Sequence, residues 1–235
     1  MATSIALVTG ANKGIGRQIA GQLADAGLIV YVGSRDAARG ERAVAEIGGD
    51  SRPLVLDVTD AAGIEAAAHQ VGALDILVNN AGISGGAATA DQEDAGAFHR
   101  IYATNVFGVV AVTNAFLPAL RRSAHPRIVN ISSGTGSLAW STGAQFPHRG
   151  SYAAYRSSKA ALNALTVYYA HALAEDGIKV NALAPGLRRT GLNATAAASD
   201  GDPAEAAAGA VRLALLPDDG PSGGFFSWDG TPVPW

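Results

Sequence analysis

Cysteine is absent from the 235 residues of this chain, and methionine occurs once. Thiol catalysis, thiolate metal sites and a disulfide framework are therefore excluded. Charge is sparse and nearly balanced, because 17 Lys and Arg stand against 20 Asp and Glu, with no basic block suited to a phosphate backbone. We therefore expect no nucleic-acid partner. The five histidines are scattered without metal-ligand spacing, so we also expect no metal site.

Long apolar runs are missing as well. The first four residues carry no basic region of the kind that opens a signal peptide. The longest apolar stretch, residues 106–120, is interrupted by Thr113, Asn114 and Pro118, so we expect it not to span a membrane. With 48% hydrophobic and 16% charged residues, the composition excludes a disordered chain or a coiled coil. We expect a cytoplasmic globular protein that can bury a core without disulfides.

Short apolar, β-branched runs recur along the chain, and amphipathic helical stretches such as residues 16–25 and 37–47 separate them. Continuous apolar strands alternating with helices indicate a parallel sheet that is covered on both faces. Right-handed crossovers then give an α/β doubly wound fold of the Rossmann type. The seven expected strands of this sheet are residues 5–8, 28–32, 53–56, 76–78, 127–131, 179–183 and 224–227.

The chain shows neither a tandem repeat nor a linker long enough to separate two domains. We therefore expect residues 1–235 to form a single domain, flanked by helices on both sides of the sheet. The Gly-, Ala- and Ser-rich residues 82–90 and 193–209 indicate mobile loops at the carboxyl edge of the sheet. That edge is where doubly wound folds bind their ligands.

A glycine-rich turn follows the first expected strand and opens the first expected helix. Residues 9–16 are Thr-Gly-Ala-Asn-Lys-Gly-Ile-Gly. Glycines allow the backbone to turn sharply and to approach a pyrophosphate, whose charge a helix N-terminus favours. A glycine trio alone is weak, and the alternative is an ordinary βα turn. Because both flanks fit, the turn favours dinucleotide binding.

The end of the second expected strand bears on the choice between NAD and NADP. An NAD-specific site carries an acid there for the ribose 2′-hydroxyl, whereas NADP requires cations for the 2′-phosphate. Gly33 and Ser34 stand in place of an acid, while Arg35, Arg39 and Lys13 supply positive charge. Asp36, one step later, weakens this interpretation without reversing it, and solvated surface residues remain the alternative.

Tyr155 and Lys159 lie four residues apart, which places them on one face of a helix. A cation at that distance is expected to lower the pKa of the phenol, so that it exchanges a proton with a carbonyl or alcohol oxygen. In isolation the pair is weak, since such pairs are common on surface helices. Tyr152 and Arg156 form a competing pair at the same spacing.

Taken together, these residues resemble the short-chain dehydrogenase/reductase family over nearly the whole chain, and within it the NADP-dependent carbonyl reductases most. Two departures from the family pattern stand out. Tyr155 follows Ser133 by 22 residues, which marks residues 143–150 as a short insertion, and Arg188 stands where a β-branched residue is common. The motifs that carry the resemblance are residues 9–16, Asp57-Val58, Asn79-Asn80-Ala81-Gly82, Asn105, Ser132-Ser133, Tyr155 with Lys159, and Pro185-Gly186 with Thr190.

The resemblance implies an NADPH-dependent reductase of ketones or aldehydes that works reversibly. Tyr155 would be the proton donor, Ser133 would orient the carbonyl oxygen, Lys159 would hold the nicotinamide ribose, and Asn105 would position a water that links the lysine to solvent. An alcohol dehydrogenase and a non-catalytic NADP(H)-binding sensor stay open as alternatives. The resemblance implies cofactor contacts from Gly10, Asn12, Lys13, Gly14, Ile15, Gly16, Ser34, Arg35, Arg39, Asp57, Val58, Asn79, Ala81, Gly82, Tyr155, Lys159, Pro185, Gly186 and Thr190.

An apolar substrate mouth is expected, and hence a small hydrophobic carbonyl or alcohol, with a small-residue lid over residues 190–203. Apolar helices at residues 103–120 and 153–174 favour a homodimer or homotetramer, because one family assembly pairs these helices across a two-fold axis. The alternative is that their apolar faces pack entirely on the sheet. The side chains expected at the mouth are Leu138, Trp140, Phe146, Leu187 and Leu192.

Overall fold

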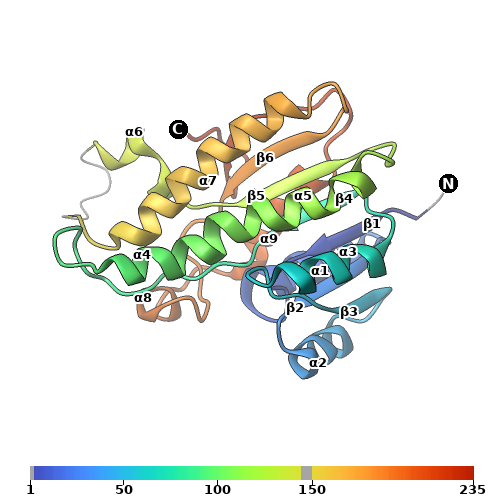
Figure 1. The fold of residues 1–235 in the computed structure, drawn as a ribbon, viewed down its shortest axis with the longest axis horizontal. Coiled ribbons are helices and arrows are strands. Elements are labelled where there is room, and N and C mark those ends of the chain that lie inside the picture. Colours follow the sequence, from blue (N-terminus) through green and yellow to red (C-terminus); the bar gives the residue numbers. More distant parts are fainter. Residues whose placement is uncertain (1–2, 144–149) are drawn as a thin grey trace.

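The computed structural model describes residues 3–143 and 150–235. Seven parallel strands form one sheet in the order β3-β2-β1-β4-β5-β6-β7, as Figure 1 shows. The order reverses between β1 and β4, which is the switch point of a doubly wound Rossmann-type sheet. The predicted fold class is confirmed. The strands are β1 Ile5–Val8, β2 Ile29–Ser34, β3 Ser51–Val55, β4 Ile76–Asn79, β5 Arg127–Ile131, β6 Lys179–Ala184 and β7 Phe225–Ser227.

Helices cover both faces of this sheet. Figure 1 shows α3, α5 and α7 side by side across its near face, while α1, α2 and α9 pack together on the other. The helices are α1 Gly14–Asp25, α2 Ala37–Ile47, α3 Ala61–Val71, α4 Ala95–Tyr102, α5 Gly108–Leu120, α6 Leu138–Ser141, α7 Ala153–Ala172, α8 Ala194–Ala197 and α9 Pro203–Ala214. A π-helical turn, η1 Ala103–Phe107, joins α4 to α5, and a 3₁₀ turn, η2 Gly134–Gly136, follows β5.

The core has two halves because side chains alternate along each strand. In β1, Ala6 and Val8 enter the half under α1 and α9, whereas Leu7 enters the half under α3, α5 and α7. All three side chains are fully buried. Burial on both faces explains why the strands read as continuous apolar runs rather than alternating ones.

The segment predicted as one mobile loop, residues 193–209, is largely helical, so that prediction is wrong. Asn193 caps α8 by accepting a hydrogen bond from the Ala196 amide, and Asp202 caps α9 by accepting one from Ala204. Pro203 occupies the first turn of α9, where a missing N–H costs nothing. The other predicted loop, residues 82–90, contains neither a helix nor a strand, and Thr89 makes an isolated bridge to Ser151.

The continuous helix made by α4, η1 and α5, Ala95–Leu120, is long and apolar enough to cross a membrane by length and composition alone. Half of its most apolar window is buried inside the fold, where α5 packs on α3 and α4 packs on α7. A core helix of a doubly wound sheet passes the same test of length and composition.

Candidate active site

A cavity of about 430 Å³ opens at the carboxyl edge of the sheet, and we call it the edge cavity. It crosses the switch point between β1 and β4, where a doubly wound sheet leaves a crevice between loops that turn in opposite directions. Its lining comprises residues 10, 12–16, 34–36, 39, 56–59, 80–85, 104, 131, 132, 155, 159, 185 and 190–192. The edge cavity therefore brings together segments from the first to the last quarter of the chain.

The glycines of the first turn are required by close packing. A Cβ on Gly16 would clash with Asn80 Nδ2 and would lie 2.8 Å from the Gly10 carbonyl oxygen. Gly10 and Gly14 have φ values of 63° and 58°, which favour glycine. No acidic residue lies in the first turn of α1, and the Lys13 side chain makes no capping hydrogen bond there. The N–H groups at the start of α1 therefore have no acidic side chain in the first turn to accept from them, and such a helix N-terminus favours an anion.

Two residues with predicted cofactor contacts do not line the edge cavity. Asn79 is buried beneath it, where its amide donates to Thr113 Oγ1 at 3.1 Å and to Asn130 Oδ1 at 2.9 Å. Gly186 turns the chain after β6 with a φ of 69° and lies against Trp228. All the other residues with predicted cofactor contacts line the edge cavity.

Asn80, which the sequence had not indicated as a site residue, lines the edge cavity and contacts the glycine turn. Its amide donates to the carbonyl oxygens of Thr9 at 2.8 Å and Gly10 at 3.2 Å. Its backbone N–H also donates to Thr9 Oγ1 at 3.0 Å. Asn80 therefore ties the end of β4 to the glycine turn. Strand alternation would have separated the two asparagines only if the last residue of β4 had been known.

Cationic side chains gather where β2 ends. Arg35 lines the edge cavity near Asp57, whose pKa is held below its usual range by hydrogen bonds from Thr59 and, to a smaller extent, by the Arg35 charge. Arg39 is engaged locally, because its Nε lies 3.4 Å from Asp36 Oδ2 and its backbone N–H donates to Asp36 Oδ1. Within the described part of the chain, Arg35 has no carboxylate at ion-pair distance.

Tyr155 enters the edge cavity from α7, whereas Tyr152 does not line it. Burial raises the pKa of Tyr155, and this outweighs the lowering by a hydrogen bond from Ser133 and by the charge of Arg156. The prediction that a nearby cation lowers the pKa of Tyr155 is therefore wrong, because the net shift is upward. Desolvation of the phenolate dominates, and at neutral pH the phenol keeps its proton.

Lys159 is only 5% exposed, and its ammonium donates to the Ile131 carbonyl oxygen at 2.8 Å. The nitrogen lies 5.8 Å from the centroid of the Tyr155 ring. Burial lowers the pKa of Lys159 to about 8, because a charged amine loses hydration in the interior. Lys159 thus titrates near physiological pH at the floor of the edge cavity.

Asn105 is fully buried in the π-helical turn, next to the edge cavity rather than in its lining. Its Oδ1 accepts from the Ile83 amide at 2.9 Å, and its Nδ2 donates to the Ile83 carbonyl at 2.9 Å and to Ser158 Oγ at 3.0 Å. The side chain therefore braces the loop after β4 against α7. π-Turns inside helices often mark functional sites.

Ser133 caps the 3₁₀ turn that follows β5. Its Oγ lies 2.8 Å from Thr135 Oγ1 and accepts a hydrogen bond from the Thr135 amide at 3.2 Å. Ser133 does not belong to the lining of the edge cavity, but its hydroxyl is near enough to Tyr155 to lower the pKa of the phenol. Sequence reasoning missed Thr135, although a hydroxyl two residues after Ser133 in a tight turn is a local signal.

The residues expected at an apolar mouth are only partly placed there. Leu192 lines the edge cavity together with Ile83, while Leu138 and Leu187 are exposed side chains outside its lining. Trp140 packs against Phe225 and Val233, and its ring lies over Gly134. Phe146 and most of residues 143–150 lie outside the described residues.

Comparison with known proteins identifies relatives along most of the chain. The family model for short chain dehydrogenase matches residues 4–201. The (-)-isopiperitenone reductase of Mentha piperita is 35% identical, and the match covers 95% of this chain and 96% of that protein. This alignment spans 307 positions, more than the 235 residues here, so the relative has segments that this chain lacks.

Two further relatives are reductases whose names state different substrates. The 3-oxoacyl-[acyl-carrier-protein] reductase FabG of Escherichia coli is 36% identical, over 83% of this chain and 77% of that protein. An NADPH-bound carbonyl reductase from chicken fatty liver superposes with a TM-score of 0.87 and 32% identity, covering 100% of both chains. With its family model matched over most of its length, this chain belongs to the short-chain dehydrogenase/reductase family of oxidoreductases.

Proposed function

We propose that the protein is an NADPH-dependent reductase that converts a ketone or aldehyde to the alcohol and works reversibly. The observation that carries this proposal is the continuity of the edge cavity, which runs from the anion-binding turn at α1 to the Tyr155 phenol and Lys159. A single elongated ligand in this cavity touches a phosphate site at one end and a proton donor at the other.

The described residues fit a dinucleotide. The glycine turn leaves no space for a Cβ at Gly16, and its helix N-terminus has no anion of its own. Residues 12–16 would hold the pyrophosphate, Arg35 would face the adenosine ribose, and Thr190 would cover the turn, since a Cβ on Gly14 would meet Thr190 Cγ2 at 3.5 Å. When bound, the reduced nicotinamide supplies the hydride.

Three side chains would then bind and protonate the carbonyl oxygen of the substrate. Ser133 donates a hydrogen bond that orients the oxygen and stabilises the charge that develops on it. Tyr155 delivers the proton, and its raised pKa supports this role, because the buried phenol is protonated at neutral pH. Lys159, held by the Ile131 carbonyl, supplies donors for the ribose and a positive charge near the phenol.

Proton replacement would pass along the Lys159 side of the edge cavity. Both Asn105 Oδ1 and the Lys159 ammonium lie within 4 Å of the position that a Cβ on Gly82 would take. The side-chain amide of Asn105 is hydrogen-bonded to the Ile83 backbone and to Ser158 Oγ. Asn105 would therefore hold the loop and α7 in position while Lys159 exchanges its proton with solvent.

We propose a small hydrophobic carbonyl or alcohol as the substrate. Ile83 and Leu192 add apolar side chains to the lining that also holds Tyr155, and the names of similar proteins include a carbonyl reductase and a (-)-isopiperitenone reductase. The short α8 is the only helix contained within the described lid residues 190–203, so the proposed lid stays small. Turnover of small polar acids alone, with none of aryl or alkyl ketones, would overturn this assignment.

Loss of NADPH absorbance with a panel of ketones and aldehydes tests the proposed function. Reduction of at least one hydrophobic carbonyl, with the alcohol recovered in stoichiometric amount, is the expected result. Oxidation of the matching alcohol with NADP⁺ measures the reverse direction and separates an alcohol dehydrogenase. Tight binding of NADPH without turnover across a broad panel would instead identify a sensor.

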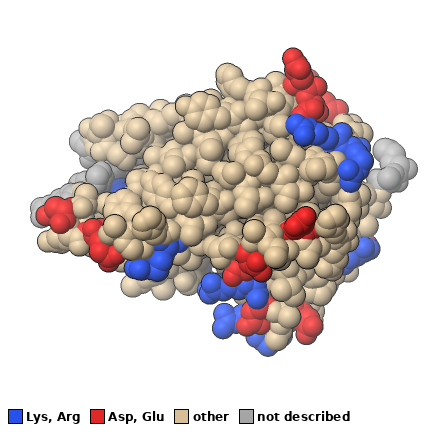
Figure 2. Space-filling view, viewed as in Figure 1, with Lys and Arg blue, Asp and Glu red and all other residues tan. Residues whose placement is uncertain are grey.

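We further propose that the chain pairs with a second copy through the outer face of α5 and α7. Figure 2 shows this face as a broad region without charged residues, with Asp, Glu, Lys and Arg gathered at its rim. Two large side chains are exposed on these elements: Phe107, the last residue of η1 just before α5, is 61% exposed, and Tyr168 on α7 is 69% exposed. Exposed apolar surface of this kind on a folded domain marks an interaction site.

A further inference from the structure

The hydroxyl of Ser133 has a single proton and two lone pairs, and its neighbours decide where that proton goes. The Thr135 amide donates to Ser133 Oγ at 3.2 Å, which fills one lone pair. Thr135 Oγ1 lies 2.8 Å from the same oxygen, at full hydrogen-bond strength. Whichever hydroxyl donates across this contact determines whether Ser133 has a proton left for another oxygen.

Building on the proposed function, we infer that Thr135 is a positioning residue that acts through Ser133. When Thr135 donates, both lone pairs of Ser133 are filled, and its only proton points to the substrate carbonyl oxygen beside Tyr155. When the direction is reversed, the Ser133 hydroxyl donates its hydrogen bond to Thr135 Oγ1, so it has no proton left to orient the substrate carbonyl. An oxygen that gains negative charge during hydride transfer favours the first arrangement, because each donor in the chain polarises the next.

The local fold holds this arrangement in place. Ser133 and Thr135 belong to one 3₁₀ turn, and its Gly136 packs so closely on Lys159 that a Cβ would meet the Lys159 carbonyl carbon at 2.7 Å. On the other side, α6 is anchored by the C-terminal residues, since Ser137 Oγ donates to the Pro234 carbonyl at 2.6 Å and the Ala139 amide donates to the Trp235 carbonyl at 3.0 Å. The Thr135 hydroxyl is thus set by the backbone on both flanks.

Thr135→Val removes this hydroxyl and keeps the side-chain shape. We expect kcat for carbonyl reduction to fall roughly three- to tenfold, the equivalent of one neutral hydrogen bond, with NADPH affinity unchanged. Thr135→Ser should restore kcat. Thr142→Val is the matched control, because the Thr142 hydroxyl donates only to the carbonyls of Leu138 and Ala139 in the same segment.

The pH profile and a double-mutant cycle separate positioning from packing. A hydrogen bond from Ser133 lowers the pKa of Tyr155, so Thr135→Val should move the alkaline limb of kcat/KM for reduction to higher pH. Thr135→Ser should leave that limb in place. In a Ser133→Ala background, Thr135→Val should change kcat no further, because its effect passes through the serine. Thr135→Ala repeats the test if the valine variant does not fold.

The outcomes are distinguishable. A wild-type protein that turns over no carbonyl overturns the proposed function and this inference with it. An active wild type whose kcat and pH profile are unchanged by both Thr135→Val and Thr135→Ala overturns the inference alone. The inference also fails, with the proposed function intact, if Thr135→Val lowers kcat equally with and without the Ser133 hydroxyl.

Discussion

The proton donor is the residue on which the proposed chemistry depends most directly. Tyr155→Phe removes the phenolic hydroxyl, and we expect kcat to fall at least ~10²-fold, as for the loss of a general acid, with NADPH affinity largely kept. Tyr152→Phe is the control on the same helix. Tyr152 directly precedes α7, its Oη lies 3.5 Å from Thr195 Oγ1, and it does not line the edge cavity. Steady-state kinetics of both variants would reverse this assignment if Tyr152→Phe were the more damaging change.

The proposed preference for NADPH over NADH rests mainly on Arg35, which lines the edge cavity. A 2′-phosphate gains a charge-assisted hydrogen bond there, worth roughly ten- to a hundredfold in affinity. Arg35→Asp should weaken NADPH by that factor and leave NADH binding similar or better, because a carboxylate suits a free 2′-hydroxyl. Arg42→Asp, on α2 but outside the edge-cavity lining, should change neither affinity. Equal binding of both cofactors to the wild type, or equal weakening of both by Arg35→Asp, would make Arg35 an ordinary surface residue.

The lysine at the floor of the edge cavity adds a pH dependence. Burial lowers the pKa of Lys159 to about 8, so this side chain is a charged donor below that pH and a neutral amine above it. NADPH affinity, measured by fluorescence titration from about pH 7 to about pH 9, should therefore weaken as pH rises through that value. Lys159→Met should bind NADPH weakly and lose this step. Lys179→Met is the control, because Lys179 begins β6 at the end away from the edge cavity. This variant should keep the pH dependence of NADPH affinity.

At this scale the sequence predicted residue types better than side-chain directions. The sequence predicts a cofactor contact from Asn79, yet the Asn79 side chain turns into the core, while its neighbour Asn80 contacts the glycine turn. The direction of the Tyr155 pKa shift could not be predicted from the sequence for a related reason. It depends on how much water burial removes, which no spacing between two residues reveals.

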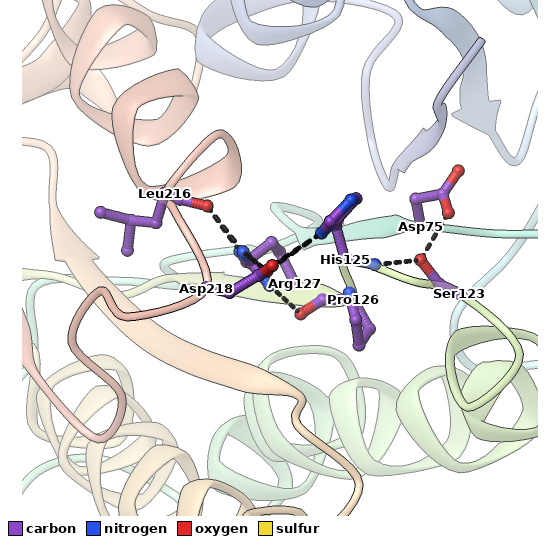
Figure 3. Close-up of polar contacts among 7 residues, drawn as sticks. All are labelled: Asp75, Ser123, His125, Pro126, Arg127, Leu216 and Asp218. Carbon is purple, nitrogen blue, oxygen red and sulfur yellow. Dashed lines mark hydrogen bonds and ion pairs between the residues drawn. The ribbon is translucent and has the colours of Figure 1, made fainter. Parts of the chain in front are cut away.

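At the scale of elements, a buried arginine holds the edge of the sheet opposite the edge cavity. Figure 3 shows Arg127, at the start of β5, reaching the segment after α9, where it donates to the Leu216 carbonyl at 2.7 and 3.0 Å and to Asp218 Oδ1 at 2.7 Å. Its side chain is 3% exposed. This contact fixes how α9 returns to β7.

Arg127→Met should lower the free energy of unfolding by roughly 1–3 kcal/mol, because it leaves the Leu216 carbonyl without its donor. For a chain of this length that is a fall in Tm of about 2–4 °C per kcal/mol. Differential scanning calorimetry measures it. Arg52→Met, which removes an exposed ion pair with Asp50, should have a much smaller effect. An equal loss of stability in the two variants would show that burial of Arg127 adds nothing.

Asp218 makes the same contact sensitive to acid. Hydrogen bonds from Arg127 and His125 hold the pKa of Asp218 below its usual range. A depressed carboxyl pKa stabilises the fold above the unfolded value of about 3.9, and this contribution is lost as pH falls through the folded pKa. Asp218→Asn should therefore be less stable at neutral pH and show a shallower loss of stability below about pH 4, measured by denaturant titration. An unchanged acid dependence would contradict this.

Sequence patterns located the strands well because most of them contain a short apolar run, and the structure moves their ends by at most two residues. They failed at α8 and α9. Their small residues were interpreted as a loop, although α9 has a buried face that includes Ala206, Ala210 and Leu213, and its compact packing on α1 suits such small residues. The cap signal was present all the same, because Asp202 followed by Pro203 is typical of a helix start.

At the scale of the whole molecule, the two sides of the sheet differ in what covers them. The half of the core under α1, α2 and α9 is closed by helices that carry charges outward, such as Arg17 on α1 and Arg42 on α2. The half under α3, α5 and α7 ends in the uncharged face that Figure 2 shows. An alignment longer than this chain means that at least one relative has segments that are missing here. The difference between the two sides of the sheet depends on which helix faces pack on it, which composition alone does not reveal.

Oligomeric state tests this asymmetry. A stable pair buries about 1,200–2,000 Å² in total, and the outer face of α5 and α7 must supply this area, with the exposed side chains of Phe107 and Tyr168 contributing to it. We expect light scattering at micromolar concentration to give two or four times the chain mass of 23.7 kDa.

Tyr168→Lys places an unpaired charge in the interface and should shift the protein toward monomer, with the folded Tm measured at low concentration unchanged. Val55→Lys, which alters an apolar side chain 58% exposed on the edge strand β3, is the matched control and should leave the assembly intact. A wild-type mass of about 24 kDa, or dissociation by Val55→Lys rather than Tyr168→Lys, would show that the uncharged face is not where the copies meet.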